Sequence, residues 1–216
     1  MNVYEVLCVL LHTDRSVFIF MSETREYIIE KAACLFLKNS YEAVSISDIS
    51  NAIGFTKGAL YHHFKNKEEL FKAVIDEHFV IYEIEIDIET ATLQEFSDAC
   101  LKNAQQTLKK LFSNMVGFEI IDYMSLIADS FRHYPGFAKD KINFMNNEIN
   151  KIKTILTNSI KRGEVRSDID TNLTAQTYFS ITLGLAGPII ENQAIDQAIE
   201  RLRGQLSQMY MLLKKV

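Results

Sequence analysis

The fold of this chain is decided by residues 45–64, SISDISNAIGFTKGALYHHF. Ser45 and Asp48 are three residues apart, the spacing of a capping box, in which two side chains satisfy backbone N–H groups at the start of a helix. Three isoleucines then recur at spacings of three and four, which predicts one apolar helical face. Gly54 follows and is suited to end this helix in a left-handed conformation.

A second short helix is predicted directly after this turn. Thr56 is a candidate N-cap, and Leu60 and Phe64 are four residues apart, so both face inward. Two short helices separated by a glycine-containing turn form a helix-turn-helix. The alternative is an ordinary hairpin of a helical bundle, which has no need of outward basic and aromatic side chains. The pattern of this second helix predicts an outer face of basic and aromatic side chains, made of Lys57, Tyr61, His62 and His63.

The charge distribution agrees with a small DNA-contacting surface. The chain has 216 residues and a formal net charge of −5, which excludes a protein that binds nucleic acid through overall positive charge. However, residues 55–67, FTKGALYHHFKNK, contain three lysines, two histidines and no acid. The basic residues therefore gather where the second short helix is predicted.

Composition predicts an all-α protein that is not an enzyme. Only 8 glycines and 2 prolines are present, too few for many tight β-turns. No paired acids, nucleophile triad, phosphate loop or metal-ligand spacing stands out, so no cofactor and no metal are expected. Three separate cysteines suggest no disulfide framework, which fits a cytoplasmic location. Cys34 and Cys100 lie in apolar helical patterns and are expected in the core.

Apolar periodicity and capping residues predict further helices along the chain. The expected ranges are 22–39, 67–90, 93–112, 119–134, 139–161, a helix capped within 170–172, and 194–215. Residues 1–20 differ from the rest: they are either a short extension or mis-called sequence upstream of a start at Met21. Their apolar run is interrupted at residues 12–15, so no membrane-spanning segment is expected.

Residues 25–74 resemble the DNA-binding region of the tetracycline-repressor (TetR-like) family. The chain departs from the usual family pattern at Ser40, where glycine is common, and at Ser50, where alanine is common. The resemblance implies a three-helix head over residues 21–67 and a larger ligand-binding and dimerisation domain over 68–216, joined by the helix 67–90. It rests on Ala32, Phe36, Tyr41, Ser45, Ile49, Gly54, Lys57, Leu60, Tyr61, Phe64, Lys67, Leu70 and Phe71.

A recognition helix enters the major groove and offers donors to phosphates and base edges. Phosphate contacts are expected from Ser45, Tyr61 and Lys67, and contacts near base edges from Lys57, Gly58, Ala59 and His62, with Thr56 beside them. For His62 and His63 the alternative is a plain surface pair. Two heads are needed for affinity, so a two-fold homodimer would read a palindromic operator with half-sites about 34 Å apart, or a multiple of that.

The resemblance also implies a dimer formed by the last two helices and a ligand pocket between the middle helices. Expected at the dimer seam are Leu183, Leu185, Leu202, Leu206 and Met209. Expected around the pocket are Tyr123, Met124, Ile127, Phe131, His133, Phe144 and Tyr178. For both sets the alternative is the core of a single protomer.

The sequence thus predicts a ligand-responsive, DNA-binding transcriptional regulator. A repressor is expected, released from its operator by a small apolar or amphipathic molecule. The alternative function is a helical dimeric small-molecule-binding protein that does not bind DNA. The basic segment FTKGALYHHFKNK argues against this alternative, because a carrier has no use for an outward basic helix.

Overall fold

The computed structural model describes residues 14–78, 84–114, 119–184 and 195–215. Within these ranges the chain forms nine α-helices and no β-strand beyond an isolated bridge between Val165 and Lys214, so the all-α prediction is confirmed. The helices are α2 (Asp14–Lys38), α3 (Ile46–Ile53), α4 (Lys57–His63), α5 (Lys67–His78), α6 (Leu93–Asn114), α7 (Ile120–His133), α8 (Phe137–Lys161), α9 (Thr171–Leu183) and α11 (Ile195–Leu213). None of these described helices is both long and apolar enough to cross a membrane.

The chain divides into two compact units. Residues 1–79 and 125–134 form the first, called here the head unit, and residues 80–124 and 135–216 form the second, called the body unit. The head unit is larger than the range 21–67 expected from the sequence. It gains α5, which packs against α2, and the second half of α7.

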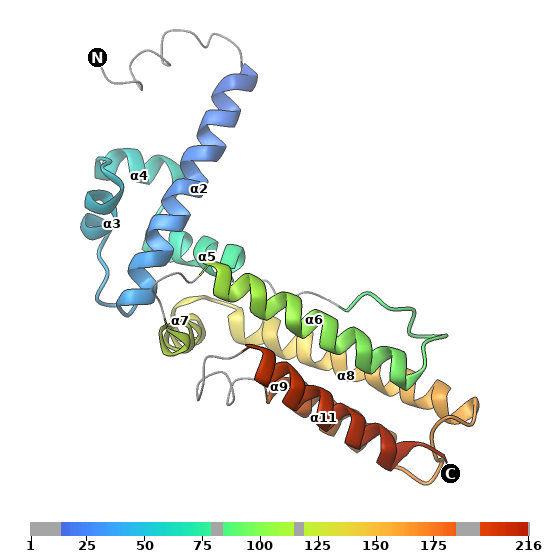
Figure 1. Ribbon diagram of the computed structural model, residues 1–216. Helices are drawn as coiled ribbons and strands as arrows, with labels where there is room; N and C mark the ends of the chain where they lie inside the picture. The colour runs from blue at the N-terminus through green and yellow to red at the C-terminus, as the bar shows by residue number, and fades with distance from the viewer. Residues whose placement is uncertain (1–13, 79–83, 115–118, 185–194, 216) are drawn as a thin grey trace. The chain divides into compact units, whose positions relative to one another are not determined.

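In the head unit, α2 packs against α3 and α5, and α3 packs against α4 (Figure 1). An aromatic cluster fills the space between α2 and α5: the Phe36 and Phe71 rings meet edge to face at 5.1 Å, and Tyr41 lies 4.8 Å from Phe71. Helix α2 begins at Asp14, inside the range expected to be an extension. Residues 1–13 lie outside the described ranges.

The predicted helix over 67–90 is wrong beyond its first turns. Helix α5 ends at His78, and residues 84–92 form no helix or strand, with a turn at 88–90; residues 79–83 are not described. The reason is visible in the sequence IEIDIE: Ile84, Ile86 and Ile88 alternate with acids, a period of two that suits an extended segment. These isoleucines pack against the core of the body unit.

The body unit is a bundle in which α6, α8, α9 and α11 run alongside one another (Figure 1). Its core includes Phe96, Ile155, Tyr178 and Leu202, all almost completely buried. The turn after α8 is tied back to the start of α6, because Glu164 accepts the Leu93 N–H at 3.0 Å. Cys100 is buried as expected, but Cys34 is exposed on α2, since its side chain lies off the single buried face of that helix.

Candidate functional site

The capping box predicted at the start of α3 is present. The Ser45 Oγ accepts the Asp48 N–H at 3.2 Å, and Asp48 Oδ2 accepts the Ser45 N–H at 2.8 Å and its hydroxyl at 2.6 Å. The hydrogen bond from the Ser45 hydroxyl, then that from its N–H, lowers the pKa of Asp48. At the other end Gly54 has φ of 73°, the left-handed conformation that ends the helix.

Helix α4 is positioned by its own cap and two apolar anchors. Thr56 Oγ1 accepts the Ala59 N–H at 3.2 Å, and Leu60 and Phe64 are buried. The Arg25 guanidinium lies 4.9 Å from the centre of the Phe64 ring. Because the anchors face inward, the opposite side of the helix must face solvent.

The outer face of α4 brings together the predicted DNA-contacting residues. Lys57, Gly58 and His62 are exposed, and the Tyr61 side chain is 50% exposed, while Ala59 is half-buried. We call Lys57, Gly58, Tyr61 and His62 the α4 face. All four residues are exposed, so all are accessible to DNA. Their contact with DNA itself stays a prediction.

His63 differs from His62, because its side chain is half-buried within the head unit. Burial lowers its pKa, and the positive charges of His62 and Arg25 lower it further. A neutral ring is therefore favoured at His63. This agrees with a packing role for His63 and an outer role for His62.

The side chain of Lys67, at the start of α5, makes its contacts within the head unit. Its Nζ donates to the Tyr41 carbonyl at 3.0 Å and to the Val44 carbonyl at 3.1 Å, and lies 4.0 Å from the centre of the Tyr41 ring. The ammonium group thus fixes the turn between α2 and α3. Its expected contact with a phosphate stays a prediction.

A carboxylate whose partner the sequence does not indicate supports the same turn. Asp129, on α7, is buried and accepts the Tyr41 N–H at 2.7 Å. His133, one turn later, stacks on the Tyr41 ring at 4.3 Å. The two residues are 88 positions or more from Tyr41 in the sequence, so no local signal pointed to this contact.

The body unit contains a cavity of about 190 Å³ between α6, α8, α9 and α11. Of the expected pocket residues, only Phe144 lines it. Lining residues that were not foreseen include Phe96, Asn103, Thr107, Glu148 and Phe179. Those on α6 are seven and four residues apart, a helical spacing that fits a plain core face equally well, so the sequence did not distinguish them.

The other expected pocket residues lie elsewhere. Tyr178 is fully buried with its hydroxyl against that of Ser97, and Tyr123 packs against the body core, where burial raises its pKa to about 12. Met124 and Phe131 are exposed, and Ile127 is half-buried. His133 belongs to the head unit. None of the residues of α7 lines this cavity, so a ligand-binding role for those expected pocket residues stays a prediction.

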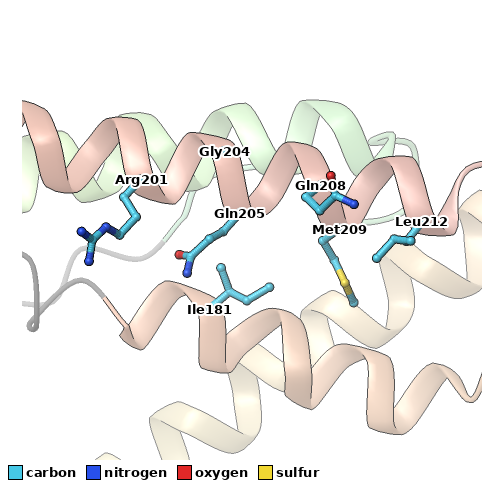
Figure 2. A pocket seen from close by; sticks show the side chains of 7 residues that line it. All are labelled: Ile181, Arg201, Gly204, Gln205, Gln208, Met209 and Leu212. Carbon is cyan, nitrogen blue, oxygen red and sulfur yellow. The ribbon is translucent and has the colours of Figure 1, made fainter.

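A second hollow lies on the open side of α9 and α11 (Figure 2). Figure 2 shows Ile181 on α9 facing Gln205 and Met209 on α11, with Gly204 at the middle of the latter helix. We call this surface the α9–α11 groove; its lining residues are Ile181, Arg201, Gly204, Gln205, Gln208, Met209 and Leu212.

The groove changes the expected dimer seam. Met209 lines it, and Leu183 is 56% exposed at the end of α9. Leu202 and Leu206, by contrast, are 1% exposed and belong to the protomer core, so neither is available to a partner. The correction has a simple cause: α11 is apolar on two sides, and periodicity does not tell which side faces inward. Leu185 lies outside the described residues.

Residues 28–74 match the family described as bacterial regulatory proteins, tetR family. The Transposon Tn10 TetC protein of Escherichia coli is 27% identical over 166 residues, covering 74% of this chain and 79% of that protein. The HTH-type transcriptional repressor KstR2 of Mycolicibacterium smegmatis is 26% identical over 200 residues, covering 85% and 91%. The HTH-type transcriptional regulator TtgR of Pseudomonas putida is 27% identical over 171 residues, covering 76% and 78%.

Solved structures share the fold. NalD of Pseudomonas aeruginosa, the secondary repressor of a multidrug efflux pump, superposes with a TM-score of 0.60 at 18% identity, covering 87% of this chain and 95% of that one. SmeT in complex with triclosan gives 0.61 at 17% identity, covering 89% and 92%. The capped helix-turn-helix of the head unit, the match to the tetR family over residues 28–74 and the named relatives support a DNA-binding transcriptional regulator whose DNA-binding region is TetR-like.

Proposed function

We propose that this regulator is a repressor that binds a palindromic operator as a homodimer and leaves it when a small apolar or amphipathic molecule occupies the body cavity. The observation that carries the proposal is the α4 face, which presents a lysine, a tyrosine and a histidine to solvent while Leu60 and Phe64 anchor the helix. The names of the relatives support the regulatory role, since KstR2 is called a repressor and SmeT is found with triclosan.

On the α4 face, each residue has a distinct role in the proposed complex. Lys57 and His62 approach base edges, and Tyr61 donates its hydroxyl to a phosphate. Gly58 has no side chain, and a Cβ placed there would meet only Thr56 Oγ1 at 3.9 Å, so the backbone is open to close approach. Ala59 adds an apolar contact to a thymine methyl.

Two residues at helix starts complete the proposed interface. Ser45 is exposed at the start of α3, where free N–H groups favour an anion. Lys67 begins α5 and already holds two carbonyl oxygens, so a phosphate contact requires its ammonium to share or exchange one of them. We therefore expect Lys67 to contribute less to DNA affinity than Lys57.

The α9–α11 groove is the proposed homodimer face. Leu212, which lines this groove, is 59% exposed, and a partner surface would cover it. Gly204 lies mid-way along α11 with nothing within 4 Å of an added Cβ, so a second helix can approach closely there. In a two-fold dimer the same groove of the second copy fills this space.

The DNA proposal is tested with the full chain and the DNA upstream of its own gene, by fluorescence anisotropy over a salt series. Replacing Lys57 and Tyr61 together by alanine should weaken binding at least about tenfold and flatten the salt dependence. Lys153→Ala, an exposed lysine on α8, is the matched control and should bind like the wild type. Equal affinity of the double variant and the control would remove the α4 face from the interface.

The dimer proposal is tested by sedimentation velocity. Leu212→Glu places a charge in the α9–α11 groove and should shift the protein towards the monomer. Ile142→Glu makes the same change at a 57% exposed position on α8 and should leave the dimer intact. A monomeric wild type, or a dimer that survives Leu212→Glu unchanged, would contradict the assignment.

A further inference from the structure

The body cavity carries polar groups that restrict what it will accept; this inference rests on the proposed function of that cavity as the effector site. An engineered apolar cavity of about 150 Å³ holds one benzene molecule. A cavity of about 190 Å³ therefore suits a compact one- or two-ring molecule. Most of the wall is apolar, including Phe96, Phe144 and Phe179, so polar groups there are few and their placement is informative.

The first polar group is the carboxylate of Glu148, which lines the cavity and is only 6% exposed. Its Oε1 accepts a hydrogen bond from Lys151 Nζ at 2.7 Å, from one turn further along α8. An ionised carboxylate only accepts hydrogen bonds, and it has more acceptor sites than this one bond uses. Its negative charge also acts on a neighbouring group: after burial, it is the second cause that raises the pKa of the Cys100 thiol, and Cys100 lines the same cavity.

The second polar group is the Thr107 hydroxyl on α6. Its oxygen is buried and has no hydrogen-bond partner among the residues that the structure describes. Buried hydroxyl groups are nearly always paired, because an unpaired one loses its hydration without compensation. Thr107 and Glu148 line one cavity from two different helices, α6 and α8.

We propose that the effector is a small, largely apolar molecule that carries a hydrogen-bond donor, a hydroxyl or an ammonium group, and that molecules bearing a carboxylate are rejected. The donor binds the Glu148 carboxylate, and the Thr107 hydroxyl pairs with the same polar end. An anion would bring a second negative charge beside a buried carboxylate, where repulsion is screened little. An ammonium gains the charge attraction, and a neutral hydroxyl gains the hydrogen bond alone.

The test uses four probes with one ring system, titrated calorimetrically into the full-length protein without DNA. β-Naphthol and naphthylmethylammonium carry donors, naphthalene carries no polar group, and β-naphthoate carries the anion. We expect both donor probes to bind at least about tenfold tighter than β-naphthoate and several-fold tighter than naphthalene. Tighter or equal binding of β-naphthoate, or no binding of either donor probe, overturns the inference.

Two variants locate the effect. Glu148→Gln keeps the shape but removes the charge, so naphthylmethylammonium should lose about tenfold in affinity and β-naphthoate should lose none. Thr107→Val removes only the hydroxyl and should weaken β-naphthol several-fold. Glu30→Gln and Thr177→Val, exposed on α2 and α9, are the controls. Circular dichroism checks folding, and if Glu148→Gln does not fold, Thr107→Val decides the outcome alone; unchanged probe affinities in the folded variants overturn the assignment.

Different results would refute the proposed ligand class and the proposed release from the operator. If donor probes bind with the expected selectivity but leave the operator complex intact, the ligand class stands and release by the cavity is refuted. If β-naphthoate dissociates the operator complex and donor probes do not, release stands and the proposed ligand class is refuted. An anisotropy measurement of the operator complex with each probe distinguishes these results.

Discussion

The capped helix-turn-helix and the contacts that join the helices of the body unit satisfy polar groups over very different sequence distances. In the head unit, Ser45 pairs with Asp48, and Thr56 with Ala59, both three residues apart. In the body unit, Glu164 binds the Leu93 N–H and Arg162 binds the Ala91 carbonyl, both across 71 residues. Local pairs leave a pattern in the sequence, and distant pairs leave none. This explains why the helix-turn-helix was recognised and the cavity was not.

One contact of the head unit joins residues that are far apart in the sequence, and its loss should have the largest effect on the free energy of unfolding. Asp129 binds Tyr41 within the head unit across 88 residues. Asp129→Ala leaves the buried Tyr41 N–H without its acceptor and should cost about 2–3 kcal/mol in the free energy of unfolding. Asp129→Asn keeps an acceptor and should cost less. Urea denaturation followed by circular dichroism measures both; a loss for Asp129→Ala as small as that of an exposed-residue variant would show that this contact does not support the head.

The free energy of unfolding of the body unit should depend on pH in the alkaline range because of the Cys100 thiol. The pKa of this thiol is raised from 9.0 to about 12, first by burial and then by Glu148. The folded protein therefore holds the proton more tightly than the unfolded chain, so the free energy of unfolding falls as pH rises from 9 towards 12. Cys100→Ala should flatten this decline without abolishing it, because the pKa of Tyr123 is raised in the same direction. Denaturation at several alkaline pH values measures the slope; identical slopes would contradict a buried thiol.

Loss of a local contact in the head unit should have a moderate effect on the free energy of unfolding. Ser45→Ala removes the cap of α3 and should lower the free energy of unfolding by about 1 kcal/mol. Ser45→Thr keeps a capping hydroxyl and should lose much less. The lowered pKa of Asp48 means that its stabilising charge is present above the ordinary value of 3.8 and is lost as pH falls through the lower folded value. Ser45→Ala should therefore also reduce the loss of stability on acidification. Thermal unfolding between neutral pH and about pH 3 checks both statements; an unchanged midpoint in the variant would refute the capping role.

The smallest effect is expected at a surface ion pair of the body unit. Arg166 Nε lies 2.6 Å from Asp168 Oδ1, and the pair lowers the pKa of Asp168 to about 2. Both side chains are more than half exposed, so water and salt screen the pair. Arg166→Ala should leave the unfolding midpoint unchanged within error. A loss as large as that of Ser45→Ala would show that the pair matters despite its exposure.

The sequence by itself determined the helix-turn-helix, its caps and the resemblance of residues 28–74 to the tetR family. The bounds of α3 and α4 follow from Ser45, Gly54 and Thr56, because a cap depends on residues three or four positions away. The face opposite Leu60 and Phe64 then had to be the outer one. Such statements need no knowledge of what the rest of the chain does.

Only the tertiary structure decided the remaining features. Apolar periodicity shows that a helix side is buried but not what lies against it, so Leu202 was expected at a dimer seam and lies in the core. The same limit hid Glu148 in the cavity wall and Asp129 beneath Tyr41. Each of these positions depends on helices that are far apart in the sequence and meet only when packed.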